Sequence, residues 1–116
     1  MIRGAHVILY STDADADRAV LQDVLGLPHV DAGGGWLILQ LPPAEVAVHP
    51  AETGGAWELY LVCDDIEATV AALGERGVTV GGPVTDQGWG LLTTISLPGG
   101  SRLGLYEARH PTAFDL

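Results

Sequence analysis

The sequence predicts an α+β chain made of two copies of a strand-helix-strand-strand-strand (βαβββ) module. The first observation is an internal repeat: a shift of 52 residues sets residues 6–21 over residues 58–73 with five identities in sixteen positions. The second is that both copies read as an apolar strand, an acidic turn, an alanine-rich helix and a closing glycine, Gly26 or Gly77. The third is that Gly and Pro clusters divide the rest of each copy into short apolar runs, as strands require.

The length and composition suit one domain. With 116 residues, 47% of them hydrophobic, the chain is long enough to bury one core but too short for a separate second domain. We therefore expect a single domain over 1–116, with module one at 1–52, module two at 53–116 and the boundary at the "ETGG" stretch, 52–55.

The first module is predicted to open on the strand "AHVILYS", 5–11. Thr12 or Asp13 is the expected N-cap of the following helix, because a short polar side chain there accepts a hydrogen bond from a free backbone N–H. Two later apolar runs, "GGGWLILQLPP" at 33–43 and "EVAVHP" at 45–50, are predicted to be strands.

The second module is predicted to open on the strand "WELYLVCDD", 57–65. Alternation places Trp57, Leu59, Leu61 and Cys63 toward the core, and Glu58, Tyr60 and Val62 on the other face. Asp64 or Asp65 is the expected cap of a helix whose stripe Ile66, Val70 and Leu73 is buried. The strands expected after it lie in "VTVGGPV", "GLLTTISLP" and "GSRLGLYEA".

Charge excludes several classes of partner. The net charge is -10, and the five basic residues, all Arg, form no cluster, which argues against nucleic acid and anionic membrane surfaces. We assign six acids to helix caps and solvated turns: Asp13, Asp15, Asp17, Asp64, Asp65 and Glu67. The single Cys63 lies in an apolar strand, which favours a reduced, cytoplasmic protein. No signal peptide or membrane span is expected.

These features together resemble the vicinal oxygen chelate superfamily, which includes glyoxalase I, extradiol dioxygenases and bleomycin-resistance proteins. The resemblance rests on the paired modules, a helix ending in "VLGLP", a second module opening on a strand followed by "DD", and the closing "LPGGSRLGLYE". It covers nearly the whole chain. It implies that the two modules curve into one cup-shaped mixed sheet.

The resemblance also implies a metal site inside the cup. His6 stands where the family has its first ligand, the repeat puts Glu58 in the equivalent place, and His49 ends the first module. Gly104 stands where the family usually has a fourth ligand, a glutamate. The implied set is His6, His49 and Glu58 for Fe, Mn, Ni or Zn, although either histidine would also serve as a hydrogen-bonded core residue.

Two function classes follow from this resemblance. The first is a divalent-metal-dependent lyase, isomerase or dioxygenase acting on a small molecule with vicinal oxygens, in which Glu58 and Tyr60 would act on the substrate. The alternative is a metal-free binding protein of the bleomycin-resistance type that sequesters a cationic or aromatic molecule. The predicted pocket residues are Tyr10, Trp36 and Trp89, of which Trp89 would equally suit a dimer contact.

A relative that has lost its site is a third possibility, and His29 and His110 are expected at the surface. The resemblance further implies a homodimer. Its cups are either completed by exchange between two chains or finished within each chain and packed edge to edge.

Overall fold

The structure is a computed structural model that describes Met1 and residues 3–116. Its first half forms a helix and a hairpin. α1 (Ala14–Ala19) continues into a π-helical turn, η1 (Val20–Val24), and β1 (His29–Asp31) pairs antiparallel with β2 (Leu37–Leu39).

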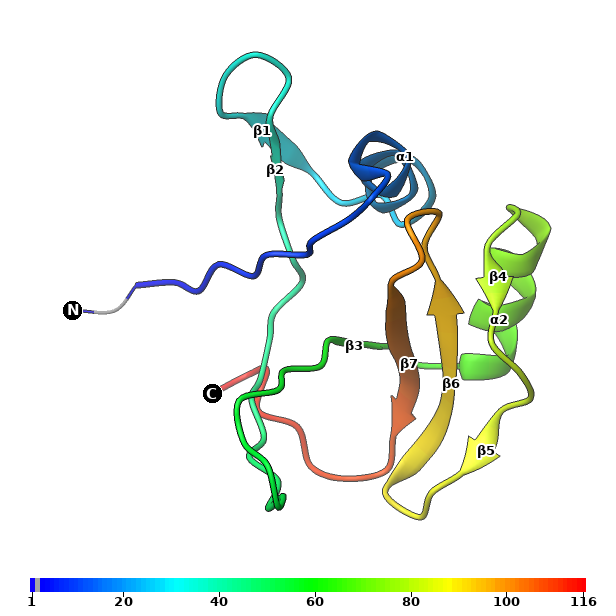
Figure 1. Cartoon of the computed structure of the whole chain (residues 1–116). Coiled ribbons are helices and arrows are strands. Elements are labelled where there is room, and N and C mark those ends of the chain that lie inside the picture. The colour runs from blue at the N-terminus through cyan, green and yellow to red at the C-terminus, as the bar shows by residue number, and fades with distance from the viewer. Residues whose placement is uncertain (2) are drawn as a thin grey trace.

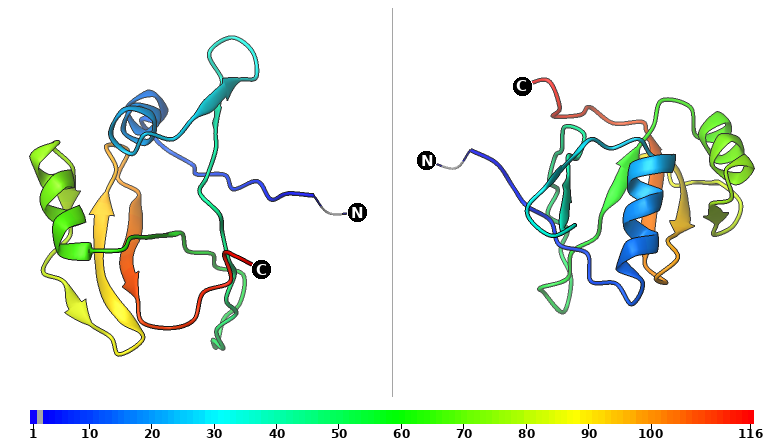
Figure 2. Two further views of the ribbon diagram at one scale, coloured as in Figure 1. Left: turned by 180° about the vertical axis from the view of Figure 1, so that it is seen from behind. Right: turned by 90° about the horizontal axis from the view of Figure 1, so that it is seen from above.

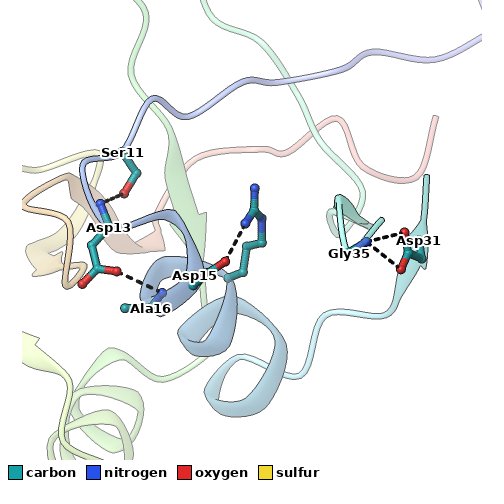
Figure 3. A network of polar contacts seen from close by, with 7 residues as sticks. Ser11, Asp13, Asp15, Ala16, Asp31 and Gly35 are labelled. Atoms are coloured by element: carbon teal, nitrogen blue, oxygen red, sulfur yellow. Dashed lines mark hydrogen bonds and ion pairs between the residues drawn. The ribbon is translucent and has the colours of Figure 1, made fainter. Parts of the chain in front are cut away.

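Asp13 is the N-cap of α1, which agrees with one of the two predicted caps, Thr12 and Asp13. Its side chain accepts a hydrogen bond from the Ala16 N–H at 3.4 Å, and its own N–H donates to the Ser11 hydroxyl oxygen at 3.0 Å (Figure 3). Gly26 follows the helix with φ of 71°, a conformation that costs glycine little. The predicted first helix is therefore confirmed with its cap and its closing glycine.

The second half forms a mixed sheet with one helix against it. Its elements are, in order, β3 (Tyr60–Val62), α2 (Ile66–Glu75), β4 (Thr79–Val80), β5 (Thr85–Asp86), β6 (Gly90–Ser96) and β7 (Arg102–Ala108). The strand order is β3-β7-β6-β4, and β5 also pairs with β6 (Figure 1). β3 runs parallel to β7 and the other pairs are antiparallel, which confirms the α+β class and the mixed sheet.

The core lies between α2 and this sheet. Ile66 and Ile95 are completely buried, and Leu73 of the predicted helical stripe is 7% exposed. Each apolar side chain that is buried in the described part of the chain comes from the second half, while α1 and η1 contribute partly buried residues. Each full burial contributes about 1.5–3 kcal/mol, so the second half carries most of the hydrophobic stabilisation.

Two predicted strands of the first half are absent from the structure. Segments 5–11 and 45–50 are extended but pair with no strand among the described residues. Segment 5–11 runs away from the five-stranded sheet in each view (Figure 2). An apolar, alternating segment becomes a strand only where another strand lies beside it, and neither segment has such a neighbour among residues 3–116.

The strand that opens the second half is shorter than predicted. It begins at Tyr60, and Leu59, Leu61 and Cys63 pack toward the core as alternation requires. Trp57 was expected in the core, but it precedes the strand and is 88% exposed. The prediction for Trp57 is wrong because the strand pairing that would fix the direction of its side chain does not extend back to residue 57.

Asp17 joins α1 to the turn between β6 and β7. Its carboxylate accepts a hydrogen bond from the Gly99 N–H at 2.7 Å, and its side chain is buried, with the residue only 3% exposed. A side chain at Gly99 would overlap Ser11 and Asp17. The assignment of Asp17 to a solvated turn is therefore wrong, because this acid fixes the helix to the sheet.

Arg76, at the end of α2, makes a second connection between the halves by donating hydrogen bonds to the carbonyl oxygens of Asp23 and Val24. None of the described helices is long and apolar enough to cross a membrane.

Candidate aromatic binding site

The candidate site begins where the Tyr60 ring lies against Gly104. Tyr60 of β3 and Gly104 of β7 are register partners in the parallel pair. A Cβ atom added at Gly104 would overlap three carbon atoms of the Tyr60 ring. Only glycine leaves room for the ring. The Tyr60 ring therefore covers position 104, where the resemblance leads us to expect a glutamate.

Three more rings extend this aromatic surface. Tyr106, two residues after Gly104, is on the same face of β7, and it meets Tyr60 edge-on with ring centroids 5.8 Å apart. Trp89 meets Tyr106 edge-on at 5.4 Å, and the His110 ring lies beside Tyr106 at 5.9 Å. Edge-to-face contacts of this kind hold rings in fixed directions. The four side chains, Tyr60, Trp89, Tyr106 and His110, are called the aromatic cluster below.

Glu58 adds a carboxylate to the aromatic cluster. The Tyr60 hydroxyl donates a hydrogen bond to Glu58 Oε2 at 2.6 Å. This hydrogen bond raises the pKa of the Tyr60 phenol, and partial burial and the negative charge of Glu58 raise it further. Tyr60 is therefore a neutral donor near neutral pH, and the remaining lone pairs of the exposed Glu58 face solvent.

Glu45 adds a second carboxylate, near Tyr106. Burial raises the pKa of the Tyr106 phenol, and the negative charge of Glu45 raises it further. The Glu45 Oε2 atom also accepts a hydrogen bond from the Ala113 N–H at 2.7 Å. Two acids thus flank two tyrosines that stay neutral.

The tail residue His110 has a defined tautomer when neutral. Its Nδ1 lies 2.8 Å from the carbonyl oxygen of Pro111, which can only accept, so Nδ1 carries the hydrogen. Its Nε2 then accepts from the Tyr106 hydroxyl at 3.4 Å. His110 was expected at the surface, but it is half-buried against Tyr106 and belongs to the cluster.

The predicted metal ligands are not gathered within one chain. His6 and His49 lie in the two unpaired segments, whereas Glu58 lies beside Tyr60. Nowhere in the described ranges do three His, Cys, Asp or Glu side chains lie close enough to hold a metal ion. The set His6, His49 and Glu58 does not fit a metal in this arrangement.

The predicted pocket residues are divided between different places. Trp89 is in the aromatic cluster, 42% exposed. Tyr10 lies in the unpaired segment and is 86% exposed, and Trp36 lies in the loop of the β1-β2 hairpin. There the Arg18 guanidinium stands over the Trp36 ring at 5.3 Å.

Sequence reasoning missed Tyr106, His110 and Glu45. For Tyr106 a signal was available, because strand alternation places it on the same face as Gly104. For Glu45 there was none, since it contacts the tail residue Ala113 across 68 residues of the sequence. His110 lies only four residues after Tyr106, but it follows the end of β7, so strand alternation does not predict where its ring lies.

The chain matches the family model described as the glyoxalase/bleomycin resistance protein/dioxygenase superfamily over residues 3–105. With this fold and this extent of match, the chain belongs to that superfamily. A search of curated proteins found no match.

Solved structures resemble the chain over most of its length. TnmS3, an antibiotic-binding protein from Streptomyces sp. CB03234, is 27% identical with a TM-score of 0.62, covering 93% of this chain and 99% of its own. A superfamily member from Sphaerobacter thermophilus is 25% identical with a TM-score of 0.59, covering 91% and 98%. A lactoylglutathione lyase from Agrobacterium tumefaciens, 20% identical with a TM-score of 0.57 and coverage of 90% and 92%, shares the fold.

Proposed function

We propose that this protein binds a planar, cationic aromatic small molecule without needing a metal ion. The observation that carries the proposal is the Tyr60 ring packed over Gly104, because it puts an aromatic surface where the resemblance expects a metal-ligating carboxylate. The similarity to an antibiotic-binding protein at 27% identity supports a binding role.

The chemistry of the cluster favours a positive, flat ligand. Ring faces attract a cation through their negative quadrupole, and ring edges and faces together stack on a planar ligand. Glu58 and Glu45 offer carboxylates to the positive charge of the ligand, and the net charge of -10 attracts it over a longer range.

Binding of proflavine, a planar cationic dye, tests the proposal. We expect saturable fluorescence changes with one site per chain, about tenfold weaker binding in Glu58→Gln, and a larger loss in Tyr60→Leu. Glu75→Gln, the same charge change at an exposed position on α2, should bind as wild type does. Equal affinities in all four proteins would contradict the proposal.

Gly104→Ala provides a sharper test, since the added Cβ displaces the Tyr60 ring without changing any charge. We expect proflavine binding to weaken about as much as in Tyr60→Leu. Circular dichroism checks that the sheet persists. An alanine variant that binds as tightly as wild type would show that the contact between Tyr60 and Gly104 does not shape the site.

The metal-dependent enzyme is the second candidate, with His6, His49 and Glu58 as proposed ligands and Tyr60 as an orienting or proton-donating group. The family match, which includes dioxygenases by name, keeps it under consideration. It requires the unpaired segments to approach Glu58, within one chain or between two.

Elemental mass spectrometry of untagged protein separates the two candidates. Near one equivalent of Fe, Mn, Ni or Zn, lost in both His6→Ala and Glu58→Ala, would favour the enzyme. Proflavine binding that is unchanged by chelation, with no equivalent of metal retained after incubation with these ions, would favour the binding protein.

A further inference from the structure

Two rings of the aromatic cluster are accessible, and a third lies between them. Tyr106, in the middle, is only 9% exposed, whereas Tyr60 is 37% exposed and Trp89 is 42% exposed. Both outer rings meet Tyr106 edge-on, with centroid distances of 5.8 Å from Tyr60 and 5.4 Å from Trp89. A ligand that uses the whole surface must therefore reach Tyr60 and Trp89 together.

The strand order sets the length of this surface. β7, which carries Tyr106, lies between β3 and β6 (Figure 1). Tyr60 comes from β3, and Trp89 comes directly before Gly90, the first residue of β6. The two outer rings therefore approach Tyr106 from opposite edges of β7, across two strand spacings of about 4.8 Å each. A single aromatic ring is shorter than this span, whereas several fused rings can cover it.

Trp89 stands in a turn whose backbone is constrained on both sides of it. Gly88, before it, has φ of 82°, a conformation that favours glycine. Gly90, after it, lies so close to β7 that an added Cβ would come within 2.8 Å of the Glu107 carbonyl oxygen and 3.2 Å of the Tyr106 ring. The ring of Trp89 thus stays against Tyr106 only while the turn keeps this conformation.

Asp86 is the side chain that holds the turn. Its Oδ1 atom accepts a hydrogen bond from the Gly88 N–H at 2.9 Å, which closes the turn locally. Its Oδ2 atom pairs with the Arg109 guanidinium at 3.2 Å. The Arg109 backbone N–H in turn donates to the Trp89 carbonyl oxygen at 2.8 Å. Asp86 therefore fixes the backbone before Trp89 and also contacts the residue that binds the Trp89 carbonyl.

We propose that Asp86 positions Trp89, and that the length of aromatic surface obtained in this way selects planar cations with several fused rings over cations with one ring. The inference rests on the proposed function, because the ligand is the one that the aromatic cluster binds. Asp86 and Arg109 are both exposed, and an exposed ion pair adds little to the stability of a fold. The role of Asp86 is therefore to direct the Trp89 ring.

The two ends of the surface contribute differently to the two kinds of cation. Glu58 is hydrogen-bonded to Tyr60, so a carboxylate and a ring face are available together at that end. A one-ring cation is satisfied there. A longer ligand gains the same contacts and stacks on Trp89 as well, and this additional contact depends on Asp86.

NMR titration of carbon-13-labelled tyrosines with proflavine and with benzamidine, a planar cation with one ring, tests the selection. Both cations carry a single positive charge near neutral pH, so a general change in the charge of the protein acts on both. Asp86→Ala should weaken proflavine binding about tenfold and leave benzamidine binding unchanged. Asp23→Ala, which removes an exposed carboxylate on η1, should change neither affinity. Equal weakening of both cations by Asp86→Ala would overturn the proposal.

Two further variants separate the position of the ring from the charge of Asp86. Asp86→Asn keeps an oxygen for the Gly88 N–H but loses the pair with Arg109, and it should retain most of the proflavine affinity. In a Trp89→Ala background, Asp86→Ala should cause no additional loss, since Asp86 acts through Trp89. An asparagine variant as weak as the alanine variant, or losses that add up in the double variant, would overturn the positioning role.

The nuclear Overhauser effect between the Trp89 and Tyr106 rings measures the position without any ligand. It should be present in the wild type and in Asp86→Asn, and be lost in Asp86→Ala. An unchanged effect in Asp86→Ala would overturn the proposal. A wild-type protein that binds neither cation would disprove the proposed function, and with it the selection among ligands, while the Overhauser effect still decides whether Asp86 positions Trp89.

Discussion

At the scale of single residues, small side chains decide where larger ones go. Gly104 is the clearest case: the absence of a Cβ lets the Tyr60 ring lie on β7, and the ring then reaches Tyr106. Gly99 allows the Asp17 carboxylate to reach a backbone N–H in the same way. In both places the missing side chain of glycine leaves the space that another side chain occupies.

The bond between Tyr60 and Glu58 predicts a pH dependence. Because the folded pKa of Tyr60 is raised above its ordinary value of 10.0, its contribution to stability is complete below pH 10 and is lost as pH rises through the folded pKa. Glu58→Gln should lower the Tyr60 pKa toward 10.0 and leave that of Tyr106 unchanged. Alkaline titration of carbon-13-labelled tyrosines by NMR measures both, and an unmoved Tyr60 resonance would contradict the assigned cause.

At the scale of elements, the two helices are placed by different forces. α2 is held by apolar burial of Ile66 and Leu73 against the sheet. α1 has only six residues in regular helix, and its acids are used locally or for docking. Asp13 caps the helix, Asp15 pairs with Arg18 at 3.0 Å, and the buried Asp17 binds the Gly99 N–H.

The docking of α1 leads to a stability prediction. Asp17→Ala should lower the free energy of unfolding by about 1–3 kcal/mol, since it leaves the partly buried Gly99 N–H without its carboxylate partner. Asp15→Ala removes only an exposed ion pair near the same helix end and should cost less than about 1 kcal/mol. Urea unfolding followed by circular dichroism measures both free energies. Equal losses of stability in the two variants would show that the hydrogen bond from the Gly99 N–H to Asp17 does not anchor the helix.

At the scale of the whole molecule, charge and openness dominate. Fifteen acidic residues and only five arginines give the chain a negative electrostatic field, which attracts cations toward its surface. The unpaired segments leave the first half without a core of its own in the described part of the chain. The negative field fits the proposed cationic ligand.

The net charge predicts that binding depends on salt. The affinity for proflavine should fall steadily as sodium chloride is raised, because salt screens the attraction between the acidic protein and the cation. Acridone, a neutral molecule of similar shape, should show no such fall. Titration of both dyes across ionic strength provides the measurement, and a salt-independent affinity for proflavine would assign its binding to stacking alone.

The sequence by itself determined the elements whose signals are local. The caps at Asp13 and Asp65, the closing glycines, the stripe of α2 and the alternation in β3 all depend on neighbours within a few residues, and the structure has each of them. Membership of the superfamily could also be predicted from the sequence, because the repeat and the closing motif are features of the sequence itself.

The tertiary structure alone decided what depends on distant neighbours. Segments 5–11 and 45–50 have the pattern of strands, but a strand exists only with a partner beside it, and no local signal states whether one is present. The sequence alone indicates that Asp17 is an acid of the first helical turn. Only the structure shows that its carboxylate binds the N–H of Gly99, which is 82 residues away in the sequence. Glu45 contacts Ala113 of the tail across 68 residues of the sequence, which no periodicity encodes. His110 is close to Tyr106 in the sequence, but it lies beyond the end of β7, where strand alternation no longer fixes the direction of a side chain.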